Sequence, residues 1–250
     1  MPARMTSSRK IVIRRDDRVF VLTGAGISAE SGLPTFRGTD GLWEGERVED
    51  VASPEGWMRD PTRVWRFYSQ RRQAALSAVP NRAHLALAEL EHSLGERFFL
   101  CTQNVDDLHE RAGSHNLVHM HGELFRSRCD RCDRPAFADA KLYESEAGHS
   151  YCPCGGRIRP NIVWFGELPF HLEQILEELQ RCTLMLVVGT SGMVQPAASF
   201  VHWANQRYLN GDAAVRTYYV GPEHPANSTA FTQVFEGPAG SLLPRLFTLR

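Results

Sequence analysis

Four of the six cysteines stand in two close pairs, Cys129-x2-Cys132 and Cys152-x-Cys154. Two such pairs can clamp one tetrahedral Zn²⁺ from two sides, and four thiolate ligands leave no open position for a reacting molecule. The glycines at residues 155–156 give the backbone freedom to wrap a metal. We therefore expect one structural zinc ion at these four cysteines; the alternative is four unligated thiols.

A glycine-rich stretch, TGAGISAESGLPTFRG at residues 23–38, directly follows the apolar run 19–22. Glycine allows a sharp turn and lets the backbone approach the phosphates of a nucleotide. The dinucleotide fingerprint G-x-G-x-x-G is not met, however, because the third glycine, Gly32, comes too late after Gly24 and Gly26. The stretch alone does not establish a phosphate site.

Amide and carboxylate side chains follow a second apolar run, in TQNVDDLH at residues 102–109. Gln103, Asn104 and Asp106 can hydrogen-bond a carboxamide and ribose hydroxyls, which an apolar loop cannot do. The alternative is helix capping, with Asn104 or Asp106 as the N-cap of a helix that begins near Asp107.

Two histidines alternate in HMHGE, residues 119–123, a pattern typical of a strand that ends at a cleft with His121 at its mouth. An imidazole titrates near neutrality and suits general-base catalysis. The alternative is a structural histidine whose ring nitrogens are satisfied by hydrogen bonds.

Short apolar runs alternate with segments of helical periodicity, which predicts an α/β fold with a parallel sheet. The expected strands cover residues 19–23, 98–102, 184–189 and 215–220, and the expected helices cover 61–76, 82–94, 172–180 and 197–209. Ligands of such sheets bind at the carboxyl ends of the strands. The loops TGAGIS, TQNVDDLH and GTSGMV each lie at a strand end, so we expect them to converge on one nucleotide site. Residues 125–160 break this pattern, and a bound metal would supply the stability that a small core cannot.

The composition is that of an ordinary globular protein. A chain of 250 residues can form one large domain or one domain with a smaller insertion. The net charge of -1 and the pI near 6.8 give no electrostatic reason to expect nucleic-acid or anionic-membrane binding. No apolar run reaches the roughly 18–20 residues that cross a bilayer, so we expect a cytoplasmic protein whose basic start is a ragged N-terminus rather than a transit peptide. Cys101 and Cys182 lie in or beside apolar runs and are expected to be buried structural thiols.

In their order along the chain, these motifs resemble those of the sirtuin family of NAD-dependent protein-lysine deacylases. The matching segments span nearly the whole chain: GAGISAESGLPTFRG, TQNVDDLHERAG, HMHGEL, the paired cysteines, RPNIVWFGE and GTSGMVQPA. The resemblance implies a single catalytic unit in which a Rossmann-like parallel sheet domain carries a small inserted zinc-binding module. The large part would comprise about residues 10–38, 77–124 and 161–250; the small part would comprise a helical piece, 39–76, and the zinc module, 125–160.

The resemblance also implies which residues hold NAD. Gly24, Ala25 and Gly26 would cradle the pyrophosphate, and a loop from Ser28 to Arg37, including Ala29, Glu30 and Thr35, would cover the nicotinamide side, where Phe36 shields the reactive ribose and Arg37 supports the loop. Gln103, Asn104 and Asp106 would address the ribose and the carboxamide, Gly189, Thr190 and Ser191 the adenosine half, and Ala239 the adenine.

The reaction that the resemblance implies consumes NAD and removes an acyl group from a lysine. The acyl oxygen attacks the ribose carbon that bears nicotinamide, and His121, with Asn104 as the second catalytic residue, draws a proton from the ribose hydroxyls. Free lysine, nicotinamide and O-acyl-ADP-ribose would result. An acyl-lysine peptide would pair as an added strand with Val163, Trp164, Phe165 and Gly166. We expect acyl-lysine proteins or peptides as partners, neither nucleic acid nor membrane, and a monomer.

Tyr68 and Arg71 stand three residues apart, on one face of the expected helix 61–76. Sirtuins that prefer succinyl- and malonyl-lysine carry this Tyr-x-x-Arg pair. A guanidinium can hold a terminal carboxylate bidentately, and a tyrosine hydroxyl adds a donor. We expect this chain to remove acetyl groups and also succinyl or malonyl groups. The alternative is that Arg71 is a solvated helix residue in an arginine-rich chain.

One segment departs from the family pattern. Where many sirtuins carry Asn-x-Glu before a proline, this chain has Tyr219-Val220-Gly221-Pro222, so those adenosine-ribose contacts are left open.

Two other functions are also left open. A protein mono-ADP-ribosyltransferase would use the same NAD site but has no role for an acid-reading pair, and a zinc module that only senses NAD would not need His121 and Asn104. Consumption of NAD, as opposed to binding, separates the enzymes from the sensor.

Overall fold

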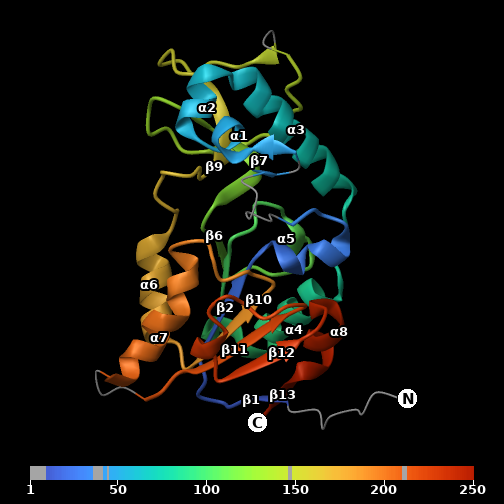
Figure 1. Cartoon of the computed structure of the whole chain (residues 1–250), viewed down its shortest axis with the longest axis vertical. Coiled ribbons are helices and arrows are strands. Elements are labelled where there is room, and N and C mark those ends of the chain that lie inside the picture. Colours follow the sequence, from blue (N-terminus) through green and yellow to red (C-terminus); the bar gives the residue numbers. More distant parts are fainter. Residues whose placement is uncertain (1–9, 36–41, 44, 146–147, 210–212) are drawn as a thin grey trace.

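The computed structural model describes residues 10–35, 42–43, 45–145, 148–209 and 213–250 (Figure 1). The strands are β1 (Ile11–Ile13), β2 (Val19–Thr23), β3 (Leu42–Trp43), β4 (Glu46–Arg47), β5 (Phe98–Thr102), β6 (Leu117–His119), β7 (Gly122–Cys129), β8 (Phe137–Ala138), β9 (Ile158–Ile162), β10 (Leu184–Val188), β11 (Arg216–Gly221), β12 (Gln233–Glu236) and β13 (Phe247–Leu249). The α-helices are α1 (Val48–Val51), α2 (Pro54–Arg59), α3 (Pro61–Ser77), α4 (Arg82–Leu94), α5 (Leu108–Arg111), α6 (Leu172–Arg181), α7 (Phe200–Leu209) and α8 (Ala239–Leu246).

A parallel sheet organises the larger part of the molecule. Among the described residues it has six strands in the order β12-β11-β10-β2-β5-β6, and every neighbouring pair is parallel. This confirms the Rossmann-like α/β class. β2 lies between β10 and β5, so the loops that follow these three strands leave the same edge of the sheet side by side.

Successive residues of the central strands point to opposite faces of the sheet, as the two-residue period of a strand requires. In β2, Val19 and Val21 join a core with α4 and α8, whereas Phe20 and Leu22 join a core with α6 and α7. Figure 1 shows these two helix pairs on opposite sides of the sheet. Because both faces are covered, the strands are apolar throughout rather than alternating.

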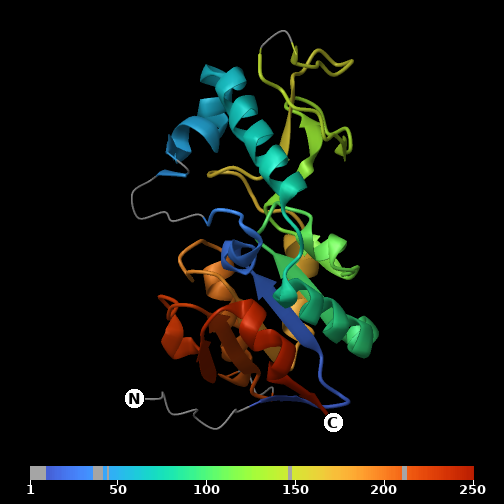
Figure 2. The ribbon, with the colours of Figure 1, turned by 90° about the vertical axis from the view of Figure 1, so that its right-hand side faces the viewer.

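A third core holds α1, α2 and α3 against β7 and β9 at the far end of the molecule (Figures 1 and 2). Trp57 lies at its centre, with ring centroids 6.4 Å from Trp65 and 5.9 Å from Trp164. β7 pairs with β8 and β9 in a small antiparallel sheet. This part of the chain therefore packs around its own apolar side chains, apart from the parallel sheet.

Arg72, which is 0% exposed, ties α3 to the small sheet. Its Nε donates to the Leu124 carbonyl over 2.8 Å, and its Nη2 donates to Ser127 Oγ over 3.2 Å. Asp139 Oδ2 lies 3.4 Å from Nη1 and balances the buried charge. A buried guanidinium needs such partners, because leaving it unpaired would cost several kcal/mol.

The expected elements agree well with the observed ones. The expected strands 19–23 and 98–102 coincide with β2 and β5. The expected strand 184–189 is one residue too long, because Gly189 turns the chain out of the sheet with a φ of +63°. The expected helix 197–209 begins as a 3₁₀ turn, Ala197–Ser199, before α7.

The two isolated cysteines are buried, as predicted. Cys101 is 0% exposed and Cys182 is 2% exposed. Burial raises the pKa of the Cys101 thiol, and it raises the pKa of Cys182 to about 12. Both thiols therefore stay protonated and inert at neutral pH. In the described part of the chain, no helix combines the length and apolar character needed to cross a membrane.

Candidate functional site

Three loops meet at the carboxyl edge of the sheet. The loop after β2 is tied to the end of β10 by a hydrogen bond from the Gly24 amide to the Val188 carbonyl, 3.0 Å. A second hydrogen bond, from the Gln103 amide to the Thr23 carbonyl over 2.9 Å, ties the loop after β5 to the last residue of β2. Gln103 Nε2 also donates to Thr190 Oγ1 over 3.1 Å. The predicted convergence of these loops is confirmed.

The glycines of the first loop allow it to pack directly against the backbone of the third. A Cβ atom added at Gly26 would lie 2.7 Å from the Gly189 carbonyl oxygen, and one added at Gly24 would lie 2.9 Å from it. The Gly26 amide donates to that same oxygen over 2.8 Å. Gly24 and Gly26 are thus required for the approach of two loops, which the missing G-x-G-x-x-G spacing did not reveal.

Ser28, Asn104 and Asp106 form a buried hydrogen-bonded group between the first two loops. Asn104 donates from Nδ2 to Ser28 Oγ over 3.1 Å, and Ser28 Oγ donates to Asp106 Oδ2 over 3.1 Å. Asp106 Oδ1 accepts from the Leu108 amide over 3.2 Å, so Asp106 also stabilises the start of α5. Asp106 thus contributes to capping, although the N-cap residue of α5 is Asp107, whereas the Asn104 side chain is bonded to Ser28 and not to the helix. The expected contact of Asp106 with a ribose or a carboxamide stays a prediction.

Burial shifts the pKa of Asp106, which is 7% exposed. Desolvation raises the pKa of this carboxyl above its usual value, although the hydrogen bonds from the Leu108 amide and Ser28 oppose that shift. A carboxyl in this setting is held by donors on both oxygens, which fixes its orientation whatever its charge.

A second layer of polar side chains supports this group; they belong to the motifs recognised in the sequence, which assigned them no role. Thr23 donates to Thr102 Oγ1 over 2.8 Å, and Thr102 Oγ1 accepts from the Asn104 amide over 3.0 Å. His109 Nε2 lies 3.0 Å from Thr23 Oγ1. Burial, chiefly, holds the pKa of His109 well below its usual value, so the ring is neutral. These contacts fix the backbone of residue 104.

His121 lies between β6 and β7, where its ring is partly exposed at the same edge. Its Nδ1 lies 3.1 Å from the Gln103 carbonyl oxygen. Because a carbonyl can only accept, Nδ1 carries the proton and Nε2 keeps its lone pair. Burial lowers the pKa of His121, partly offset by that hydrogen bond, so the neutral form prevails at neutral pH. The predicted base therefore has the right tautomer.

His119 differs from His121 and carries a charge. Its Nδ1 lies 2.8 Å from the Asn104 carbonyl and its Nε2 lies 2.7 Å from Glu110 Oε1, so both nitrogens donate. Burial opposes the charged form, but the hydrogen bond and charge of Glu110 prevail and raise the pKa of His119. His119 is thus a structural imidazolium that holds residue 104. The alternation of the two histidines did not separate these roles.

The segment 163–166 runs beside this edge. The Val163 amide donates to the His121 carbonyl over 2.9 Å, and the Phe165 amide donates to the Ala52 carbonyl over 3.0 Å. The Trp164 amide donates to Glu167 Oε2 over 2.8 Å. Since these three amides are already bonded, a peptide strand would pair through other groups of the segment, such as carbonyl oxygens or exposed Gly166.

Tyr68 and Arg71 lie on α3 and are both buried, at 0% and 8% exposure. Arg71 Nη1 donates to the Phe67 carbonyl over 3.3 Å, and its guanidinium carbon lies 3.6 Å from the centroid of the Phe67 ring. Trp164 Nε1 donates to Tyr68 Oη over 3.2 Å. Arg71 is therefore not the solvated helix residue of the alternative interpretation.

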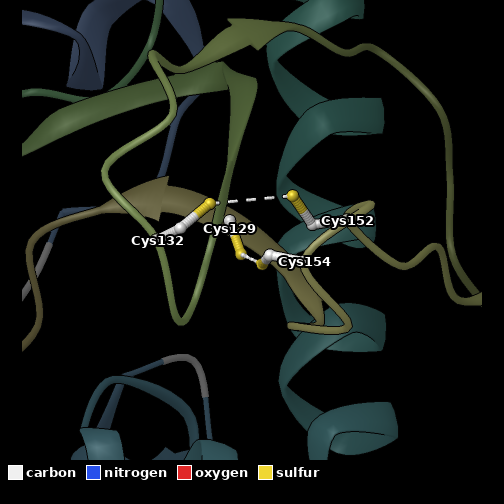
Figure 3. A group of neighbouring side chains, drawn as sticks. All are labelled: Cys129, Cys132, Cys152 and Cys154. Atoms are coloured by element: carbon white, nitrogen blue, oxygen red, sulfur yellow. Dashed lines mark hydrogen bonds between the residues drawn. The ribbon is translucent and has the colours of Figure 1, made fainter.

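The four paired cysteines gather at the far end of the molecule with their sulfur atoms turned toward one another (Figure 3). All four Sγ atoms lie within 4.8 Å of each other, with 3.5 Å between Cys129 and Cys154 and 3.7 Å between Cys132 and Cys152. A tetrahedron with Zn–S bonds of about 2.3 Å places its sulfurs roughly 3.8 Å apart. The donor set therefore fits one zinc ion with no open position.

The backbone supports these thiolates. The Arg131 amide donates to Cys129 Sγ over 3.3 Å, and the Gly156 amide donates to Cys154 Sγ over 3.4 Å. A Cβ atom at Gly156 would lie 2.6 Å from Cys129 Sγ, so the predicted need for glycine here has a steric reason.

The third loop, which follows β10, is supported by a tyrosine from the segment that departs from the family pattern. Tyr219 Oη donates to the Thr190 carbonyl over 3.0 Å, and burial raises the pKa of Tyr219 to about 12. A Cβ atom at Gly221 would lie 2.3 Å from Tyr219 Oη. The phenol thus fills the space that a side chain at residue 221 would occupy. Ser191 is exposed in the same loop.

The remaining predicted nucleotide residues are more scattered. Glu30 Oε1 accepts from the Gly240 amide over 2.8 Å, so it caps α8 beside buried Ala239. Ala25 and Thr35 are half-buried and Ala29 is exposed. Phe36 and Arg37 lie outside the described residues. Asn81, which the sequence analysis missed, donates from Nδ2 to the Ile27 carbonyl over 2.7 Å and supports the first loop while capping α4.

Comparison with known proteins places these features in a wider context. The model of the Sir2 family matches residues 24–196. The NAD-dependent protein deacylase of Escherichia coli (strain K12) is 46% identical over 229 residues, which cover 91% of this chain and 80% of the relative. The protein of the same name from Shewanella oneidensis is 46% identical over 230 residues, covering 91% of this chain and 92% of the relative.

Solved structures of Sir2 proteins are similar to this chain over most of its length. A Sir2 homolog–NAD complex superposes with a TM-score of 0.80 at 40% identity, covering 93% of this chain and 89% of that one. A Sir2 mutant with a p53 peptide and NAD gives a TM-score of 0.73 at 29% identity, covering 91% of each chain.

Proposed function

This chain belongs to the Sir2 family, and on that premise we propose that it removes acyl groups from protein lysines with consumption of NAD. The observation that supports this most directly is the buried group of Ser28, Asn104 and Asp106 beside a neutral His121 at the carboxyl edge of a parallel sheet. Such an edge is where α/β sheets bind nucleotides.

The candidate NAD residues are those of the three loops: Gly24, Ala25, Gly26, Ser28, Gln103, Asn104, Asp106, Gly189, Thr190 and Ser191. They fit a dinucleotide because glycine backbone and buried amide and carboxyl groups meet at one edge. When bound, NAD would supply the ADP-ribosyl group that takes up the acyl oxygen as nicotinamide leaves. One water is consumed when the bond between the acyl carbon and the lysine nitrogen breaks, and the products are lysine, nicotinamide and O-acyl-ADP-ribose.

The protein residues would then act as follows. His121 accepts a proton from a ribose hydroxyl at Nε2, because Nδ1 is bonded to the Gln103 carbonyl. Asn104 donates a hydrogen bond from Nδ2 to Ser28 Oγ, and its Oδ1 would accept one from a donor such as a ribose hydroxyl. Asp106 holds Ser28 in place. The segment 163–166, whose Val163 amide donates to the His121 carbonyl, would receive the peptide.

We propose in addition that the acyl pocket accepts succinyl and malonyl groups. Tyr68 and Arg71 supply a neutral phenol and a guanidinium in a buried setting, where a charge-assisted bond to a carboxylate is stronger than in water. An acetyl group needs neither. The buried guanidinium is the observation that favours a dicarboxylic acyl chain.

The separate cores support the proposed division into a sheet domain, about residues 10–38, 77–124 and 161–250, and a small domain, about 39–76 and 125–160. We also propose that the protein works as a cytoplasmic monomer on acyl-lysine peptides or proteins. Size-exclusion chromatography with light scattering tests the oligomeric state.

The function is tested by mass spectrometry of matched acetyl- and succinyl-lysine peptides, incubated with the protein with and without NAD. We expect NAD-dependent loss of both acyl groups, and a ratio of desuccinylation to deacetylation that falls at least tenfold in Arg71→Met, since a charged hydrogen bond is worth about 1.5–3 kcal/mol. If nicotinamide is released while neither peptide loses its acyl group, the deacylase proposal fails and protein mono-ADP-ribosylation takes its place.

A further inference from the structure

The side chain of Trp164 is held rigidly beneath the segment 163–166. It is 2% exposed, and the Arg159 guanidinium carbon lies 3.2 Å from the centroid of its ring. Arg159 is held in turn by Glu167, with 2.6 Å between Nη1 and Oε1 and 3.0 Å between Nη2 and Oε2. Glu167 also accepts from the Trp164 amide. The orientation of the indole is therefore fixed by two contacts: Arg159 on its ring and Glu167 on the backbone amide of Trp164.

The indole N–H points at the hydroxyl of Tyr68. Trp164 Nε1 donates to Tyr68 Oη over 3.2 Å, and Tyr68 is 0% exposed. Burial, above all, raises the pKa of Tyr68 to about 12, so the phenol is neutral and keeps its proton. An indole N–H can only donate. The Tyr68 oxygen therefore accepts from the indole, and the phenolic proton points away from the indole.

That constraint matters because a phenolic O–H lies near the plane of its ring and has two favoured directions. Because the indole hydrogen points at the Tyr68 oxygen, it disfavours any direction of the phenolic O–H that points toward the indole. Arg71 lies one turn along α3 on the same face as Tyr68. A carboxylate held by Arg71 is an acceptor, and it gains a second bond only if the Tyr68 proton is turned outward from the indole.

We propose that Trp164 is a positioning residue for acyl-chain selection, whose indole N–H orients the Tyr68 hydroxyl to donate to the terminal carboxylate of a dicarboxylic acyl group. This inference rests on the proposed succinyl and malonyl specificity of the same pocket. Trp164 thereby links the backbone segment that meets the peptide to the group that selects the acyl chain.

The neighbouring tryptophans do not share this role, which provides matched controls. Trp57 Nε1 donates to Asp130 Oδ2 over 3.0 Å, and Trp65 Nε1 donates to the Ile158 carbonyl over 3.1 Å. Both indoles belong to the same apolar core as Trp164, but their N–H groups bind elsewhere. A change of Trp57 to phenylalanine removes an indole N–H from this core without touching Tyr68.

The test measures kcat/KM for matched succinyl- and acetyl-lysine peptides in Trp164→Phe, Trp57→Phe and Tyr68→Phe, and in the double variant of Trp164 and Tyr68. In Trp164→Phe we expect the succinyl-to-acetyl ratio to fall about threefold to tenfold, the range of one hydrogen bond. Any general loss of activity from weaker packing cancels in this ratio. Trp57→Phe should leave the ratio unchanged.

The double variant shows whether Trp164 acts through Tyr68. If it does, the ratio in the double variant equals that in Tyr68→Phe alone, because the indole has no hydroxyl left to orient. Multiplicative losses would overturn the proposal, and so would an unchanged ratio in Tyr68→Phe, even if Trp164→Phe does not fold. A ratio that falls in Arg71→Met but not in Trp164→Phe would overturn this inference and leave the proposed function standing.

Discussion

Asn104 donates a hydrogen bond from Nδ2 to Ser28 Oγ over 3.1 Å, although 76 positions separate the two residues in the chain. The bond joins the loop after β2 to the loop after β5, and Asp106 extends it on the other side of the hydroxyl. One hydroxyl therefore holds together both loops of the proposed nicotinamide end.

Replacing Ser28 by alanine should lower kcat/KM for deacylation about tenfold or more. The substitution leaves buried Asp106 without one donor and lets the Asn104 amide turn, at a cost of about 1–3 kcal/mol. Steady-state kinetics on an acetyl-lysine peptide provide the measurement. Ser31→Ala is the control, since its hydroxyl accepts from Asn81 and not from Asn104. Equal losses in both variants would show that the bond to Asn104 has no particular importance.

The acid limb of activity should lie below the ordinary pKa of histidine. His121 works as a base only when it is neutral, and burial lowers its pKa below 6.5. As the pH falls, kcat/KM should therefore hold through 6.5 and decline only at more acid pH. A profile of kcat/KM from about pH 5 to 8, compared with an NMR titration of the His121 ring, checks this. An acid limb whose midpoint lies above pH 6.5 would contradict the assignment of His121 as the base.

Removal of zinc should unfold the small sheet. The four thiolates join residues 129–132 to residues 152–154, and a bound ion that ties these two segments together contributes several kcal/mol of folding free energy. We expect Cys152→Ser to lose the metal and to lower the melting temperature by about 10 °C or more. Metal analysis should find one zinc per chain in the parent protein and in Cys182→Ala, whose thiol lies in a different core. A fully stable parent protein without zinc would refute this.

Tyr219→Phe should weaken the binding of NAD and affect turnover little. The lost hydroxyl donates to the Thr190 carbonyl in the third loop, which contacts Gln103 and Gly24. We expect the KM for NAD to rise about twofold to tenfold, with kcat changed by less than about twofold. Tyr218→Phe removes a hydroxyl from the neighbouring residue of β11, which packs on the other face of the sheet, and should leave the KM for NAD unchanged. An unchanged KM in Tyr219→Phe would separate this tyrosine from the nucleotide loops.

The parallel sheet and the zinc cysteines could be predicted because their signals are local. A fully buried strand is a short apolar run, and metal ligands occur in close pairs, so β2, β5 and the four cysteines follow from neighbouring residues alone. The order of the weaker motifs along the chain then identified the family, which no single motif did.

The missed features depend on contacts between distant segments. The residues next to Gly26 in the sequence do not indicate that Gly189 packs against it. The motif HMHGE likewise does not show that Glu110 makes His119 a cation while His121 stays neutral. The burial of Arg71 is likewise set by the fold around α3. Tyr219 and Gly221 are different, since residues two apart on a strand share a face, and this pair could have been recognised as one large and one absent side chain.

The pairing of β1 with β13 has a consequence for how the chain matures during synthesis. These strands lie at opposite ends of the described sequence and form a parallel ladder in which Ile11 faces Phe247 and Ile13 faces Leu249. A ribosome delivers β1 first, so its isoleucines emerge long before their partner strand leaves the exit tunnel. The ladder between β1 and β13 therefore cannot form until residues 247–249 have left the exit tunnel, and until then Ile11 and Ile13 lack the partner strand that they have in the folded protein.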